Sequence, residues 1–259
     1  MNVAIITQED YFFIPENIKK IVNRFGSSSI GIILLIDSKG SINNKKSLFI
    51  RGFGLIQSIK YGIKVLQKKL IFFLNLIKLS KNKTYSIAGV AKHFNIPFSI
   101  VNDINEDEIV EKLETLDLDI IISFSAPVVF KDRLLNASKL GCINLHCSYL
   151  PSYAGLFPSF WVLFKNEKFT GCTIHRMDSK IDNGDILMQE KVEIRNDDTI
   201  FSLLNKTKSI GGDLMVRVID ELYQNKLKPI KNHASEKNYF TWPTLKELYL
   251  FRKNGGKLL

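Results

Sequence analysis

The sequence has few cysteines and no long apolar run. Its 259 residues include three cysteines, an odd and sparse set that gives no sign of a disulfide framework and favours a reducing cytoplasm. The longest uncharged run of its most apolar segment, residues 70–77, is too short to span a bilayer. Gln8, Glu9 and Asp10 follow the first apolar residues at once, which predicts a strand there and not a signal peptide. We therefore expect a cytoplasmic protein with no transmembrane segment.

One segment contains no acidic residue. Residues 38–84 hold eleven Lys and Arg residues and no Asp or Glu. The other 25 of the 36 basic residues are balanced by the 26 acidic residues, all of which lie outside this segment. The net charge of +10 therefore indicates a local basic surface, not a protein that binds nucleic acid over its whole surface.

Within this basic segment, residues 53–77 predict a helix, because apolar residues recur at helical spacing with Lys60, Lys64 and Lys68 between them. The helix is too apolar for an ordinary solvated surface helix. We expect it to pack on the body of the protein or on a second copy in a homodimer. A peripheral contact of residues 53–77 with an anionic membrane is the second alternative, and nucleic acid is a further one.

The rest of the chain predicts an α/β fold. Strands are expected at residues 3–7, 30–36, 98–101, 120–124 and from 141, with helices between them. Continuous β-branched runs of this kind are typical of buried parallel strands. We predict a Rossmann-like, mostly parallel sheet, with the basic helical insertion (about 38–84) after the second strand. The body would span residues 1–230, and residues 231–259 would form an extension packed on it, with a frayed tail from residue 252.

A polar pair stands at the end of the strand that begins at Gly141. Asn144 and His146 are two residues apart, so their side chains point to the same face of the strand. Pro151 and Gly155 then lead the chain out of the sheet. Ligands of open α/β sheets bind outside the carboxyl ends of the strands, so this pair is a candidate site. The alternative is that His146 is an ordinary core or surface residue whose hydrogen bonds are satisfied by a neighbour.

A second candidate is the polar turn at residues 177–186, which carries three carboxylates and an Asn-Gly pair between two predicted strands. An ordinary hairpin with Asp side chains capping backbone amides would look the same.

Together, the two segments resemble the folate-dependent formyltransferase family, which includes methionyl-tRNA, glycinamide ribonucleotide and sugar N-formyltransferases. The family pattern is matched by Asn144, His146, Ser148, Leu150, Pro151, Tyr153 and Gly155, followed by Asp182, Gly184 and Asp185. The weaker likeness extends over about residues 120–219. The loop after the first strand lacks the glycines with which glycinamide ribonucleotide formyltransferases hold a phosphate.

The resemblance implies a reaction and its residues. It implies an N-formyltransferase that takes the formyl group of 10-formyltetrahydrofolate to a primary amine, with Asn144, His146 and Asp182 as the catalytic residues. It further implies that the folate lies against Phe124, Ser125, Ala126, Pro127 and Val128 and against Ile181 and Asn183. A plain strand-to-helix loop at 124–128 is the alternative from the residues alone.

The acceptor stays open between a small amine, such as an amino sugar, and aminoacyl-tRNA. Methionyl-tRNA formyltransferases resemble residues 181–185 best, but they carry a further C-terminal domain for which the residues after the last predicted helix are too few. A formyltetrahydrofolate hydrolase and a non-catalytic folate or membrane-surface binding module are the rival functions.

Other reactive side chains lack a convincing arrangement. Cys147 lies on the other strand face from the polar pair and Ser148 lies past the strand end, so we expect no covalent nucleophile. We also expect no metal site, because the spacing of the Cys and His residues lacks close Cys-x-x-Cys pairs.

Overall fold

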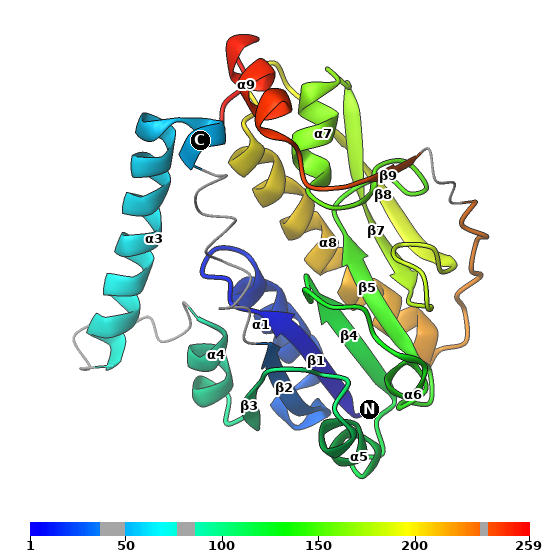
Figure 1. Cartoon of the computed structure of the whole chain (residues 1–259). Coiled ribbons are helices and arrows are strands. Elements are labelled where there is room, and N and C mark those ends of the chain that lie inside the picture. Colours follow the sequence, from blue (N-terminus) through cyan, green and yellow to red (C-terminus); the bar gives the residue numbers. More distant parts are fainter. Residues whose placement is uncertain (37–49, 77–85, 234–237) are drawn as a thin grey trace.

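The protein is built on a seven-stranded sheet in the order β3-β2-β1-β4-β5-β7-β8. The computed structural model describes residues 1–36, 50–76, 86–233 and 238–259. Five neighbouring strands run parallel, namely β1 (Val3–Gln8), β2 (Ile30–Ile36), β3 (Phe98–Val101), β4 (Ile120–Phe124) and β5 (Cys142–His146). The last two, β7 (Phe169–Arg176) and β8 (Ile186–Glu193), are antiparallel to their neighbours. The predicted Rossmann-like, mostly parallel sheet is confirmed (Figure 1).

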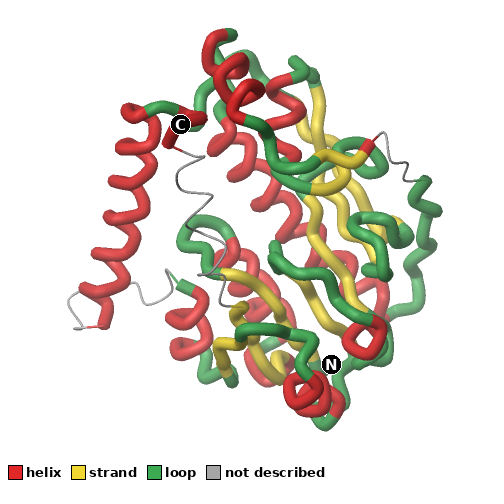
Figure 2. Tube along the Cα trace, in the orientation of Figure 1, coloured by secondary structure: helices red, strands yellow, loops and turns green. Residues whose placement is uncertain are grey.

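Helices cover both faces of the sheet (Figure 2). One face packs on α1 (Ile14–Phe25), α4 (Ile87–His93) and α8 (Ile200–Tyr223), and the other packs on α5 (Asp107–Glu114) and α6 (Asp132–Leu135). A short 3-10 turn, Ser27–Ser29, joins α1 to β2.

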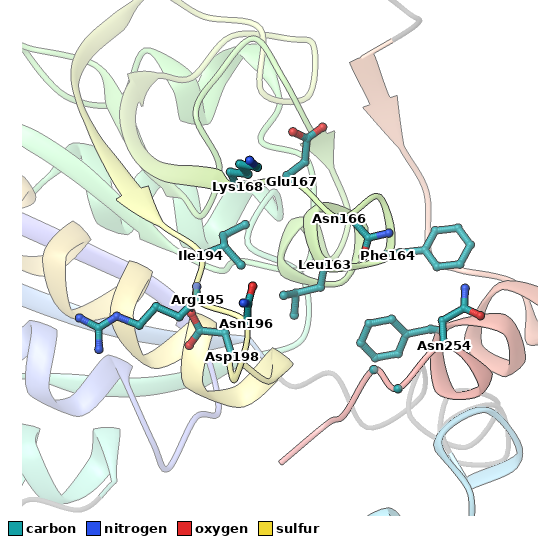
Figure 3. A pocket seen from close by; sticks show the side chains of 13 residues that line it. Leu163, Phe164, Asn166, Glu167, Lys168, Ile194, Arg195, Asn196, Asp198 and Asn254 are labelled. Carbon is teal, nitrogen blue, oxygen red and sulfur yellow. The ribbon is translucent and has the colours of Figure 1, made fainter.

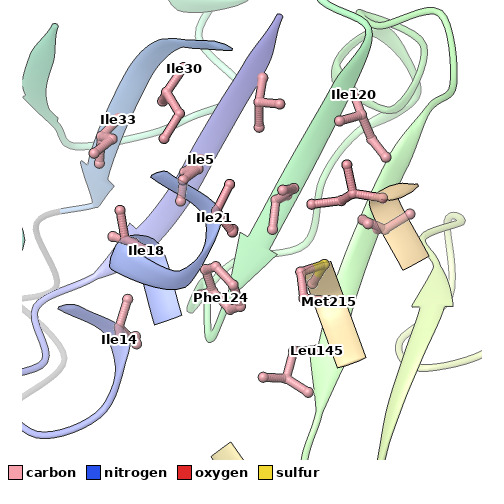
Figure 4. Close-up of a cluster of buried hydrophobic side chains, with 14 of the residues drawn as sticks. Ile5, Ile14, Ile18, Ile21, Ile30, Ile33, Ile120, Phe124, Leu145 and Met215 are labelled. Atoms are coloured by element: carbon pink, nitrogen blue, oxygen red, sulfur yellow. The ribbon is translucent and has the colours of Figure 1, made fainter. Parts of the chain in front are cut away.

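The strands bury side chains on both faces. Ile5 faces α1 and α8, whereas Ala4 and Ile6 on either side of it face α5 and α6. The buried side chains on the face covered by α1 and α8 are drawn in Figure 4, where Ile5, Ile18 and Ile21 meet between β1 and α1. This burial on two faces explains the continuous apolar runs of the sequence, since a strand covered on both sides has no polar face.

Helix α3 (Leu55–Leu76) lies outside these two layers, along the side of the molecule (Figure 1). It follows a short helical segment at residues 50–53 and confirms the helix predicted at 53–77, of which residue 77 lies outside the described residues. Most of the remaining predicted insertion (38–49 and 77–84) also lies outside the described residues. None of the described helices combines the length and apolarity needed to span a bilayer.

The C-terminal residues return to the middle of the chain. The two-residue strands β6 (Ala154–Gly155) and β9 (Tyr239–Phe240) pair in parallel beside α7 (Pro158–Phe164), and α9 (Leu245–Lys253) follows. The predicted frayed tail is wrong, because α9 includes Arg252 and Lys253 and because the end of the chain packs on α8. Leu258 is buried, and the amides of Ile200 and Phe201 donate to the carbonyls of Lys257 and Leu258.

Candidate functional site

Strand β5 places the polar pair where the sheet changes direction. Asn144 pairs with Ser123 of the parallel strand β4 on one side and with His175 of the antiparallel strand β7 on the other. His146 pairs with Thr173 of β7. Both side chains therefore stand at the carboxyl end of β5, as the sequence pattern predicts.

Asp182 joins the two predicted segments. It lies in the turn between β7 and β8 and is only 8% exposed. Its Oδ2 atom is 3.3 Å from Nδ1 of His146 and accepts a 2.8 Å hydrogen bond from the amide of Gly155. Its other oxygen, Oδ1, is 3.4 Å from Nε2 of His175. The carboxylate thus contacts two imidazoles and the loop after β5 at once.

These contacts decide the charge of Asp182. Burial is the largest influence and by itself raises the pKa of the carboxyl group. The attraction of His146, the hydrogen bond and charge of His175 and the Gly155 amide together outweigh it and lower the pKa to about 2. Asp182 is therefore an anion at neutral pH despite its burial.

The partners of His146 specify its hydrogen-bonding form. Its Nε2 atom is 2.9 Å from the carbonyl oxygen of Tyr153, and its Nδ1 atom faces the Asp182 carboxylate. A carbonyl and a carboxylate only accept hydrogen bonds, so only the imidazolium form of His146 satisfies both. Both ring nitrogens of His146 thus face hydrogen-bond acceptors, which fixes the orientation of the ring.

His175 is a member of this cluster that the sequence-based interpretation missed. Its Nδ1 atom donates to the carbonyl of Arg176 over 2.7 Å, and its Nε2 atom is 3.2 Å from Nδ2 of Asn144. The sequence did contain a signal for His175, since Thr173 and His175 alternate along the predicted strand that precedes the polar turn at residues 177–186. That β7 would lie against β5, with His175 opposite Asn144, depends on the sheet order, which no local pattern contains.

The turn that carries Asp182 is held by several local contacts. Asp178 accepts hydrogen bonds from the Lys180 amide (2.9 Å) and from Nδ2 of Asn183 (2.7 Å), and Nδ2 of Asn232 donates to the Asp182 carbonyl (2.8 Å). Asp182 itself has a left-handed backbone conformation with φ of 50°. The polar turn of the sequence therefore serves to fix one buried carboxylate.

A cavity of about 190 Å³ opens beside this cluster. The loop after β4 forms one wall and the Asp182 turn forms the other. Its lining consists of Ser123, Ala126, Pro127, Val128, Val129, Phe130, Asn144, Leu156, His175, Met177, Asp178, Lys180, Ile181 and Asp182. Sites for drug-sized ligands usually measure about 300–1,000 Å³, so this cavity has room for a flat ring but not for a whole drug-sized ligand.

Four of the seven residues predicted to contact folate line this cavity, namely Ala126, Pro127, Val128 and Ile181. The other three are engaged elsewhere. Phe124 is 2% exposed and points into the core beside α8 (Figure 4), because it lies on the opposite face of β4 from the cavity residue Ser123. Ser125 accepts a 2.9 Å hydrogen bond from Nζ of Lys208, and Nδ2 of Asn183 donates a hydrogen bond to the Asp178 carboxylate.

The cysteines have no reactive environment. All three are buried, and burial raises the pKa of the Cys142 and Cys172 thiols to about 12. Burial also raises the pKa of Cys147, which lies just beyond β5. Among the residues that the structure describes, no group of three His, Cys, Asp or Glu side chains is arranged to hold a metal ion.

A second cavity, of about 300 Å³, lies between α7, α9 and the end of β8 (Figure 3). Asp198 lines it together with Arg195 and Asn254. The Asp198 carboxylate already accepts from the Arg195 amide (2.9 Å), from Ser202 Oγ (2.7 Å) and from Lys206 Nζ (2.5 Å). The Asp198 carboxylate therefore stabilises the start of α8. The smaller cavity, which Asp182 lines, is the better candidate site.

The amino-acid sequence has clear relatives. A methionyl-tRNA formyltransferase from Clostridium botulinum is 38% identical over 156 residues, which is 60% of this chain. The aligned part covers 50% of that relative, so the match spans about half of its length.

Solved structures share the fold. The N-formyltransferase from Helicobacter canadensis, in complex with folinic acid and dTDP-3-aminofucose, aligns with a TM-score of 0.62 and 18% identity over 97% of this chain and 80% of that one. The phosphoribosylglycinamide formyltransferase from Anaplasma phagocytophilum aligns with a TM-score of 0.62 and 17% identity, covering 94% of this chain and 99% of that one.

The family model described as Formyl transferase matches residues 79–219. This range is more than half of the chain and includes Asn144, His146, His175 and Asp182. The protein belongs to the formyl transferase family.

Proposed function

We propose that the protein transfers the formyl group of 10-formyltetrahydrofolate to a primary amine in the cytoplasm. The observation that carries the proposal is the cluster of Asn144, His146, His175 and Asp182 beside a cavity that can enclose a flat ring. Family membership supports the reaction type. Folinic acid, named with the Helicobacter canadensis structure, supports a formylated folate as donor.

The reaction needs a polarised formyl group. The amine nitrogen attacks the formyl carbon, a new C–N bond forms, and the carbonyl oxygen gains negative charge. Asn144 offers an amide N–H as a donor to that oxygen, and the Nε2–H of His146 would become a second donor when the oxygen replaces the Tyr153 carbonyl that faces it. Asp182 stabilises the developing charge indirectly, because its carboxylate orients the His146 ring.

Two proton transfers complete the reaction. The attacking nitrogen becomes cationic on addition and loses a proton, and N10 of the folate gains one as its bond to the formyl carbon breaks. A carboxylate with a pKa of about 2 is a weak base, so Asp182 suits the proton of this acidic, cationic nitrogen and not that of a free ammonium group. The products are a formamide and tetrahydrofolate, and no covalent enzyme intermediate is needed.

The acceptor is an amino sugar, another small amine or an aminoacyl-tRNA. The Clostridium botulinum relative is a methionyl-tRNA formyltransferase, whereas the Helicobacter canadensis structure contains a nucleotide-linked amino sugar. Both acceptors present a primary amine, which is the only feature that the proposed chemistry requires.

The test is a screen of amines with the purified chain and 10-formyltetrahydrofolate. Methionyl-tRNA, nucleotide-linked amino sugars and small amines would be compared by mass spectrometry for the added formyl group. Tetrahydrofolate and formate released without any amine would instead identify a hydrolase. Folate binding without either product would identify a binding module and reject the transferase.

A further inference from the structure

Helix α3 presents an apolar surface that nothing in the described structure covers. Six of its aliphatic side chains are 50–71% exposed: Leu55, Ile56, Ile59, Ile63, Leu66 and Leu70. From Ile56 onward they are alternately three and four residues apart, so they line one side of the helix. Single exposed aliphatic residues are common on proteins, but a continuous line of them marks an interaction surface.

The rest of the helix is anchored to the body, which fixes the direction of this apolar line. The Tyr61 ring lies 6.1 Å from that of Phe12, and Lys64 Nζ lies 4.8 Å from the Phe201 ring. At the start of the helix, Gln57 Oε1 accepts a 3.4 Å hydrogen bond from the amide of Leu259. Because these contacts hold one side, the apolar side faces away from the body.

The charges of α3 are all of one sign. The helix contains Lys60, Lys64, Lys68 and Lys69 and no acidic residue. Lys60 stands between Ile56 and Ile63 along the edge of the apolar line, whereas Lys64 and Lys69 lie toward the body, over the rings of Phe201 and Tyr11. A second copy of the same helix would bring the same lysines, and it has no carboxylate to pair with them. An anionic surface complements them.

We propose that this face of α3 binds the surface of an anionic membrane. The aliphatic side chains would lie at the boundary between headgroups and acyl chains, and Lys60 at the edge of the line would reach the lipid phosphates. The body of the protein would then sit on the membrane with α3 parallel to it. This binding does not depend on the proposed reaction.

Co-sedimentation with vesicles tests the proposal on the full chain. We expect binding to vesicles of equal parts phosphatidylglycerol and phosphatidylcholine at low salt, and no binding to pure phosphatidylcholine. Binding should weaken in salt of about 1 M, where the Debye length is only about 3 Å. Lys60→Glu should weaken it by about fivefold or more, since one lysine near such a surface contributes roughly that factor.

The triple variant Ile59→Gln, Ile63→Gln, Leu66→Gln should weaken binding by at least about tenfold, because it removes apolar groups from the lipid. A matched triple variant, Ile100→Gln, Ile230→Gln, Tyr249→Gln, alters residues that are 58–64% exposed elsewhere and should bind like the wild type. Thermal melts would confirm that both variants fold.

Three results would overturn the proposal. The first is no binding to the anionic vesicles at low salt. The second is equal binding by the two folded triple variants. The third is a dimer in light scattering that the α3 triple variant separates into monomers, which would assign the face to a second copy.

Discussion

Asn144 and His175 face each other across β5 and β7, with Nδ2 of the amide 3.2 Å from Nε2 of the imidazole. Nδ1 of His175 donates to the Arg176 carbonyl, so Nε2 is the ring atom that meets both the Asn144 amide and, at 3.4 Å, Oδ1 of Asp182. The second N–H of the amide is then left for the cavity, where the proposed reaction places the formyl oxygen. His175 therefore acts as a positioning residue for both Asn144 and Asp182.

Replacing His175 tests that role. We expect His175→Ala to lower turnover by up to about a hundredfold, because the Asn144 amide loses its orientation. The variant should also shift the acid limb of the pH–rate profile to higher pH, since Asp182 loses one of the contacts that lower its pKa. Steady-state kinetics over a pH series would measure both. Wild-type turnover with an unmoved acid limb would contradict the assignment.

Asn144, His146 and Asp182 should act as one unit. Alanine at any one of the three positions is expected to cut turnover by roughly a hundredfold or more, since each removes an oxyanion donor or the charge that supports it. The affinity for folinic acid, measured by calorimetry, should change little. His93→Ala is the matched control, because His93 lies on α4 away from the cavity lining. Near-full turnover of His146→Ala would refute the mechanism.

The cavity should hold the ring of the folate. Ala126 lines it and is partly buried, so Ala126→Trp should fill part of its volume of about 190 Å³ and weaken folinic acid binding. Ala88→Trp on α4 is a control, because Ala88 is also partly buried but does not line the cavity. Unchanged binding by a folded Ala126→Trp variant would move the folate to another site.

Much of the fold was predictable from the sequence, because local apolar patterns favoured one kind of element over another. The runs at 30–36 and 120–124 are short and rich in β-branched residues, which favours buried strands, and the spacing of Asn144 and His146 put both on one face. The family pattern added Asp182. The features that the sequence did not predict depend on tertiary contacts. His175 joins the site only because β7 lies against β5, and the position of Phe124 follows from which face of β4 meets α8.

The prediction of a frayed tail from residue 252 was wrong for a related reason. Its Gly and Lys residues are typical of a mobile end, but the backbone of residues 257 and 258 accepts the free amides at the start of α8. Backbone pairing of this kind leaves no trace in composition.

Acid should destabilise the fold through Asp182. Its pKa is about 2 in the folded protein against an ordinary value of 3.8, so the folded state favours the ionised form. The resulting stabilisation is complete above about pH 4 and is lost as the pH falls toward 2. Between pH 5 and pH 2, we expect the free energy of unfolding of the wild type to fall by roughly 2 kcal/mol more than that of Asp182→Asn. Denaturant titrations at both pH values would measure it, and equal losses would contradict the prediction.

Gly184 should tolerate no side chain. A Cβ atom there would lie 2.0 Å from the carbonyl oxygen of Arg176, so the Asp182 turn would have to move. We expect Gly184→Ala to lower stability by about 1–3 kcal/mol and to reduce turnover. Gly62→Ala is the control, because a Cβ atom on that α3 residue meets nothing within 4 Å and alanine favours a helix. A wild-type melting temperature and turnover for Gly184→Ala would disprove the close contact.

The pairing of β6 with β9 gives the site an order of assembly. Gly155, whose amide holds Asp182, pairs with Phe240, and the amide of Leu156 donates to the Phe240 carbonyl over 2.7 Å. A ribosome releases residues 144 and 182 before it has made residue 240. The cluster of Asn144, His146, His175 and Asp182 is therefore synthesised before the strand that pairs with its loop, and the contacts of Gly155 and Leu156 with Phe240 can form only afterwards.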